Sequence, residues 1–146
     1  MSRAQVAEER MIDAPAEKIY DCIADYRQHH PRFLPPAFSN FIIEEGGYGA
    51  GTIVSFDLKL ANQIQHIRQR VEEPTPGSVL VEQTLDVPHT TTFSLRPDGA
   101  RTLVRMEAVR ETHGLRGIME RMLMPRMLAP LFRQELKLLD RYVAAQ

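Results

Sequence analysis

The sequence predicts an α+β protein in which a curved, seven-stranded antiparallel sheet wraps around a long C-terminal helix. Three observations lead to this fold class. Apolar residues recur at helical spacing as far as Tyr26 and alternate with a period of two from Phe38 onward. Turn signals divide the alternating region into six successive short segments. From Gly114 the apolar spacing becomes helical again and stays so towards the C-terminus.

The N-terminal region should contain one strand and a short helical stretch. The strand is expected at residues 4–12. Asp13 or Ala14 lies where the following helix would be capped, and Pro15 suits its first turn. The helix should end near Arg27, because the segment HHPRFLPP, which follows shortly after, contains three prolines. We therefore expect one or two short helices after the first strand.

Six further strands are expected, separated by turn signals such as PTPG and PDGA. The alternation is clearest where Val54, Phe56 and Leu58 share one face. The strands are expected at residues 38–43, 54–60, 65–72, 78–85, 90–96 and 102–108. A sheet of this size must curl. Its concave face then needs a cover, and only the C-terminal helix is large enough.

The C-terminal helix carries an apolar stripe and two internal prolines. The stripe consists of Ile118, Met122, Ala129, Phe132, Leu136, Leu139 and Val143. Pro125 and Pro130 each remove a backbone donor, so we expect them to kink or split the helix. A broken helix could move and open a cavity; a static kink is the alternative.

The segment EEGGYGAGTIV packs four glycines closely together, which raises the question of a phosphate-binding loop. A Walker loop ends in Gly-Lys-Ser/Thr, but here Thr52 and Ile53 follow Gly51. The dinucleotide fingerprint requires G-x-G-x-x-G before a helix, whereas a strand is expected here. We therefore expect a turn between two strands, in which the glycines supply positive φ.

Composition argues against several classes of protein. The 18 basic and 19 acidic residues give a net charge of −1, so no electrostatic attachment to nucleic acid is expected. The single cysteine, Cys22, can form neither an intramolecular disulfide nor a thiolate metal cage, and no metal or cofactor motif is found. No signal peptide and no apolar run of about 20 residues is found. We expect one cytoplasmic domain over residues 1–146 without an integral membrane segment.

Four motifs occur in order along nearly the whole chain: IDAPAEKIYDCIADY, Gly51-Thr52 after the glycine-rich turn, DGARTLVRM and PRMLAPLFRQELKLLDRYV. With the order of elements, they resemble the helix-grip (SRPBCC or START-like) superfamily. This superfamily includes START lipid-transfer domains, polyketide cyclase/dehydrase-like proteins, coenzyme-Q-binding proteins and pathogenesis-related plant allergens. The resemblance implies a helix-grip fold with a cavity for an apolar small molecule between the sheet and the C-terminal helix.

The cavity implied by this resemblance should be lined by apolar and amide side chains. The methionines of the C-terminal helix suit an irregular apolar ligand, although they could equally fill a solid core. Gln65 and Gln69 share a face with Ile67 and could orient a polar ligand head; a partly solvated sheet edge is the alternative. The lining candidates are Tyr26, Phe33, Phe56, Leu58, Gln65, Ile67, Gln69, Met106, Met119, Met122, Phe132 and Leu136. The candidates for the entrance are His30 and Tyr48.

No catalytic constellation stands out, so no catalytic residue is assigned. His29 and His30 are expected to be surface residues at a helix end rather than metal ligands or catalytic groups. Cys22, between Ile19 and Ile23, is expected to be a packed thiol. The acid–base candidates that could enter the cavity are Tyr20, Tyr26, Glu82, Asp86 and Glu107, although charged strand residues usually face solvent.

The first functional hypothesis is binding or transfer of a lipid, polyketide or quinone-like molecule without catalysis, by a monomer or homodimer. The alternative is a polyketide cyclase or dehydratase, which requires at least two polar groups that converge deep in the cavity, one with a perturbed pKa. A second alternative is a protein-interaction module, which requires an exposed apolar patch on the sheet or the terminal helix.

Overall fold

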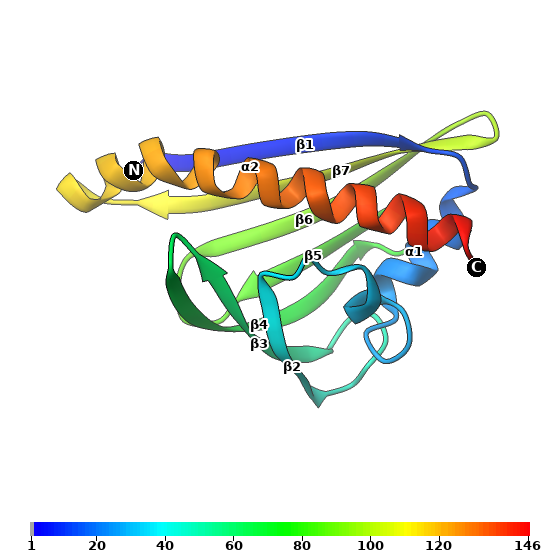
Figure 1. Ribbon diagram of the computed structural model, residues 1–146, viewed down its shortest axis with the longest axis horizontal. Coiled ribbons are helices and arrows are strands. Elements are labelled where there is room, and N and C mark those ends of the chain that lie inside the picture. The colour runs from blue at the N-terminus through cyan, green and yellow to red at the C-terminus, as the bar shows by residue number, and fades with distance from the viewer. Residues whose placement is uncertain (1) are drawn as a thin grey trace.

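The computed structural model describes residues 2–146, which form one sheet of seven antiparallel strands, two α-helices and a short 3₁₀ helix (Figure 1). The strands are β1 (Ser2–Ile12), β2 (Phe38–Glu45), β3 (Ile53–Leu60), β4 (Gln63–Thr75), β5 (Val79–Thr84), β6 (His89–Asp98) and β7 (Arg101–Thr112). The helices are α1 (Ala16–Ala24), the 3₁₀ helix η1 (His30–Phe33) and α2 (Gly114–Ala144). The predicted fold class and the short helices after the first strand are confirmed.

The sheet is a meander to which the first strand is added at the far edge. The spatial order is β1-β7-β6-β5-β4-β3-β2, so β2 to β7 follow one another in space as in sequence, and β1 pairs with β7. Side chains alternate between the two faces of a strand. The inward positions of neighbouring strands therefore form rows, one of which joins Glu82 of β5 to Thr91 of β6.

Helix α2 runs along the concave face of the sheet without interruption (Figure 1). The expectation that Pro125 or Pro130 splits this helix is therefore wrong. Each proline removes the hydrogen bond that its own nitrogen would donate and crowds the carbonyl one turn before it, but neither effect ends the helix here. Tertiary packing of the apolar face supplies most of the stability of a helix in a folded protein, and α2 packs against β1 and β7.

The two halves of α2 have different surroundings. In the C-terminal half, Phe132, Leu136 and Leu139 are buried as predicted. In the N-terminal half, Ile118 is 45% exposed and Met122 is 58% exposed, so the predicted stripe is wrong for these two residues. The last turns of α2 close a solid core with α1 and η1, whereas the part of α2 from Arg116 to Glu135 borders a cavity.

The glycine-rich segment is the turn between β2 and β3, as expected. Gly46, Gly47, Gly49 and Gly51 have φ values of 68°, 146°, 65° and 90°. A side chain at Gly47 or Gly49 would also collide with the side chain of Arg27 or Glu73, respectively. The turn fastens the end of α1, because the Tyr26 N–H donates to the Gly47 carbonyl at 2.9 Å.

Candidate functional site

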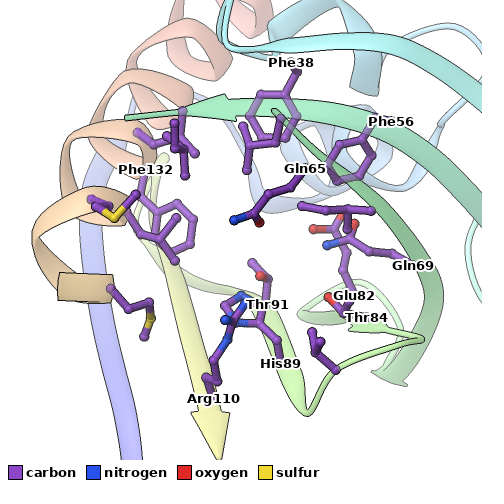
Figure 2. Close-up of a pocket in the computed structure, with 18 of the residues that line it drawn as sticks. Phe38, Phe56, Gln65, Gln69, Glu82, Thr84, His89, Thr91, Arg110 and Phe132 are labelled. Atoms are coloured by element: carbon purple, nitrogen blue, oxygen red, sulfur yellow. The ribbon is translucent and has the colours of Figure 1, made fainter. Parts of the chain in front are cut away.

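A cavity of about 810 Å³ lies between the concave face of the sheet and the N-terminal part of α2 (Figure 2). Its walls come from strands β2 to β7, from the segment after α1 and from α2. Most of the lining is apolar and includes Phe38, Phe41, Phe56, Leu58, Met106, Met124, Met127, Leu128, Leu131 and Phe132. Such a volume and such walls suit a small apolar ligand.

Most side chains proposed from the sequence as lining do line this cavity. They are Tyr26, Phe56, Leu58, Gln65, Ile67, Gln69, Met106, Met119 and Phe132. The other three do not. Phe33 and Leu136 are 0% and 1% exposed and belong to the solid core, and Met122 points outward from α2. A helical stripe identifies one face of α2 but does not distinguish core, cavity and solvent along its length.

The two residues proposed for the entrance lie elsewhere. His30 is 2% exposed and forms part of the inner wall, because η1 turns its ring inward to stack on Tyr26 with ring centroids 4.3 Å apart. The expectation of a surface histidine is therefore wrong for His30. Tyr48 is exposed outside the cavity, where its hydroxyl donates to Asp21 at 2.7 Å and holds the glycine-rich turn against α1.

Four titratable side chains, which we call the inner cluster, converge on the inner wall of the cavity. They are Tyr26, His30, Glu82 and Glu135. The Tyr26 hydroxyl donates to Glu82 Oε2 at 2.6 Å, and His30 Nε2 lies 3.7 Å from the same oxygen. Glu135 faces the cavity from α2 and is only 3% exposed. Figure 2 shows Glu82 beside Gln69 on the sheet wall.

Burial controls the charge of the inner cluster. It raises the pKa of Glu82 to about 7, although the hydrogen bond from Tyr26 acts in the opposite direction. Burial and the nearby Glu82 carboxyl hold the pKa of Glu135 well above its usual range. Glu82 therefore changes charge near neutral pH, and Glu135 holds its proton more tightly than an ordinary glutamate does.

The imidazole of His30 is held neutral in one tautomer. Its Nδ1 lies 2.6 Å from the Ile23 carbonyl oxygen, which can only accept, so Nδ1 carries the proton. Burial lowers the pKa of His30 to about 4. At neutral pH the bare Nε2 thus faces Glu82, and no positive charge from His30 compensates the buried carboxyl.

A second group of polar residues, which we call the outer cluster, lines the cavity farther along β6. It consists of His89, Arg110 and Glu120. Arg110 Nε donates to His89 Nδ1 at 3.1 Å, and another N–H of Arg110 donates to Glu120 at 3.0 Å. Burial, and then the Arg110 charge, lower the pKa of His89 to about 4. Figure 2 shows His89 and Arg110 together below Thr91.

Sequence reasoning considered Glu82 but expected strand charges to face solvent, and it missed Glu135. Both positions carried a signal. Glu82 alternates in phase with Leu80 and Thr84, which are buried. Glu135 lies three residues after Phe132 and four after Leu131, on the buried face of α2. Of the two amides, Gln69 is buried and Gln65 is exposed, and both line the cavity from β4, which is not an edge strand.

The first turns of α2 expose an apolar patch beside the cavity. Leu115, Ile118, Met119, Met122 and Leu123 are between 45% and 84% exposed. Met119 and Leu123 also line the cavity, so the patch continues into its rim.

Three further findings on residues 2–146 concern metal binding, membrane-spanning helices and the single cysteine. No group of three or more His, Cys, Asp or Glu side chains in this range is arranged to hold a metal ion. None of the helices in the described range is both long and apolar enough to cross a membrane. Cys22 is 3% exposed, which confirms the expectation of a packed thiol.

Several solved structures share this fold. The KanY protein superposes with a TM-score of 0.86 at 20% identity over 99% of both chains. The Zhui aromatase/cyclase from Streptomyces sp. R1128 has a TM-score of 0.78 at 17% identity, over 98% of this chain and 94% of its own. Norcoclaurine synthase from Thalictrum flavum, in complex with dopamine and hydroxybenzaldehyde, has a TM-score of 0.77 at 15% identity, over 99% of this chain and 88% of its own.

At these identities the structural likeness shows the fold alone, and it confirms the helix-grip fold. No curated protein matches the chain. The family model described as "Polyketide cyclase / dehydrase and lipid transport" matches residues 3–144. The chain therefore belongs to the polyketide cyclase/dehydrase and lipid transport family.

Proposed function

We propose that the protein binds an apolar small molecule that carries a carbonyl group and catalyses a proton transfer in it, as a cyclase or dehydratase does. The observation that carries this proposal is the Glu82 carboxyl, which accepts a hydrogen bond from Tyr26 on the wall of an apolar cavity. Its pKa of about 7 makes it a base and an acid of matched strength near neutral pH.

In the proposed reaction, the Glu82 carboxylate takes a proton from a carbon next to a ligand carbonyl. The electron pair of the broken C–H bond moves onto the carbonyl oxygen as an enolate. The enolate carbon then attacks a second carbonyl carbon of the same molecule, a C–C bond forms, and the new alkoxide takes the proton from Glu82, which returns to the carboxylate. In a dehydration, Glu82 then takes a further C–H proton and gives it to the new hydroxyl, which leaves as water as the C=C bond forms.

Glu135 supplies the complementary acid in this proposal. The raised pKa of Glu135 favours its protonated form, which can donate a hydrogen bond to a ligand oxygen. Among residues 2–146 no side chain hydrogen-bonds to Glu135, and no fully enclosed side-chain oxygen or nitrogen atom lacks a partner. The Glu135 carboxyl is therefore open to the cavity, where a ligand can reach it. The family's description, and the name aromatase/cyclase of one structural relative, support the same reaction class.

A second candidate is binding or transfer of an apolar ligand without catalysis. The observation that favours it is that Glu82 already has Tyr26 as a partner and is only 7% exposed, while most of the wall is apolar. Both candidates require the same cavity, and they differ in whether Glu82 exchanges a proton with the ligand.

The test uses 2-tetralone, an apolar bicyclic ketone with C–H bonds next to its carbonyl. Its binding is followed by a thermal shift, and exchange of those hydrogens in D₂O by proton NMR. We expect exchange above the buffer rate, and a loss of about a hundredfold or more in Glu82→Gln with binding retained. The same change at Glu44, which pairs with Arg68 outside the cavity, is the control. Binding with no exchange would establish the carrier instead, and absence of both would refute the proposal.

A further inference from the structure

We propose that the ligand is also held at a second point, where His89, oriented by Arg110 and Glu120, donates a hydrogen bond from Nε2 to a carbonyl oxygen. This inference rests on the proposed function and specifies its ligand as an apolar molecule with oxygen atoms at two places along its length. The outer cluster lies outside the proton-transfer site and has no role in that step as described above.

The hydrogen bonds of the outer cluster determine which nitrogen of His89 carries the proton. A guanidinium group can only donate, so the 3.1 Å contact from Arg110 Nε makes His89 Nδ1 an acceptor. Burial and the Arg110 charge keep the imidazole neutral at physiological pH. The single proton of the ring is therefore on Nε2, the reverse of the arrangement in His30.

The Nε2–H group of His89 is a donor without a protein partner. Within residues 2–146 no hydrogen bond to Nε2 is formed, and no fully enclosed side-chain nitrogen or oxygen is left unpaired. Nε2 is therefore reached from the cavity that His89 lines, although the residue as a whole is only 8% exposed. A buried donor without a partner costs free energy, so a ligand that supplies an acceptor at this point binds more tightly.

The chemistry of the outer cluster selects a neutral acceptor rather than an anion. The Arg110 charge is already balanced by Glu120 at 3.0 Å, and the His89 ring is uncharged. A carbonyl oxygen is the acceptor that fits such a donor. Glu120 and Arg110 act through His89 and are positioning residues.

The spacing of the two clusters gives the length of the ligand. Glu82 pairs with Thr91 in the sheet, and His89 is the next inward-facing residue of β6. Two residues along a strand span roughly 7 Å. A fused-ring molecule with a reacting carbon near Glu82 can thus place an oxygen beside His89.

The test compares 2-acetylnaphthalene with 2-ethylnaphthalene, which has nearly the same shape but no oxygen. Dissociation constants for both are measured by calorimetry in the wild type, in His89→Phe and in Glu120→Gln. We expect the preference for the ketone to fall about tenfold in His89→Phe and about threefold in Glu120→Gln. His113→Phe, at an exposed histidine before α2 that does not line the cavity, is the matched control.

A second measurement does not depend on the folding of any variant. In wild-type protein with ¹⁵N-labelled histidine, we expect His89 to carry its proton on Nε2 and His30 on Nδ1. The His89 Nε2 resonance should move when 2-acetylnaphthalene is added and not when 2-ethylnaphthalene is added. A proton on His89 Nδ1, or equal shifts with both probes, would overturn the inference.

The outcomes separate this inference from the proposed function. An unchanged ketone preference in His89→Phe, with 2-tetralone exchange still dependent on Glu82, refutes the second contact and leaves the function standing. Failure of the wild type to bind either naphthalene refutes the second contact, and the proposed function falls with it only if 2-tetralone neither binds nor exchanges.

Discussion

The inner and outer clusters bury similar groups but control their charge differently. In the inner cluster, Glu82 and Glu135 have no cation beside them, because burial keeps His30 neutral, so the carboxyl pKa values rise. In the outer cluster, Glu120 is paired with Arg110, and that cation helps to keep His89 neutral. The comparison teaches that one end of the cavity can change charge near neutral pH, while the other presents a donor of constant charge.

The largest expected effect is the pH dependence of stability in Glu82→Gln. The pKa of Glu82 is raised from 4.5 when unfolded to about 7 when folded. The contribution of the bound Glu82 proton to the unfolding free energy is fully present below pH 4.5 and is lost as the pH rises through 7. Relative to wild type, the variant should therefore gain about 3 kcal/mol of unfolding free energy between these pH values. Urea unfolding at a series of pH values measures this, with Glu111→Gln at an exposed carboxyl as control.

A constant stability difference between Glu82→Gln and wild type across that range would contradict the account of the inner cluster. It would mean that the folded protein does not hold the Glu82 proton more tightly than the unfolded chain does.

His89→Phe should show the opposite sign. The pKa of His89 is lowered from 6.5 to about 4. The contribution of neutral His89 to the unfolding free energy is therefore present above pH 6.5 and is lost as the pH falls through 4. Relative to wild type, the unfolding free energy of this variant should rise by about 2–3 kcal/mol as the pH falls from 6.5 to about 4. The same urea series measures it. If the stability of His89→Phe relative to wild type rose with rising pH instead, burial would not shift the pKa values of Glu82 and His89 in opposite directions.

Replacing one glutamate in each cluster by leucine should also give effects of opposite sign. Glu135 is buried and has no side-chain hydrogen-bond partner in residues 2–146, so Glu135→Leu should stabilise the protein by about 1–3 kcal/mol. Glu120 is partly exposed and paired with Arg110, so Glu120→Leu should destabilise by about 1 kcal/mol or less. Thermal unfolding of both variants at pH 7 measures the difference. Destabilisation by Glu135→Leu would indicate a protein partner for that carboxyl.

Periodicity was sufficient to predict the arrangement of elements, and once the family resemblance implied a cavity, it also indicated most of the residues in the cavity wall. Alternation placed Phe56, Leu58 and Gln69 on the inward face of the sheet, where they lie. Periodicity could not separate Leu136, in the solid core, from Phe132, at the cavity, because both lie on the same face of α2.

The inner cluster depends on contacts between residues distant in the chain. Tyr26 and Glu82 are 56 residues apart, and no local pattern brings them together. His30 was expected to be a surface residue because it lies just past the predicted end of a helix, but η1 turns its ring into the wall. Periodicity could thus indicate that Glu82 and Glu135 face inward, but it could not show that they meet Tyr26 and His30, because such contacts are a property of the assembled fold.

Tyr26→Phe should give the smallest effect and isolates one hydrogen bond of the inner cluster. The Tyr26 hydroxyl donates to Glu82 at 2.6 Å and opposes the effect of burial on the Glu82 pKa. Without this bond, the pH at which 2-tetralone exchange reaches half its maximum should rise from about 7 by roughly one unit, with an unchanged rate at high pH. Tyr48→Phe, which removes a hydroxyl that donates to Asp21 outside the cavity, is the matched control. An unchanged profile in Tyr26→Phe would show that burial alone determines the charge of Glu82, whereas a lower rate at every pH would show that Tyr26 contacts the ligand itself.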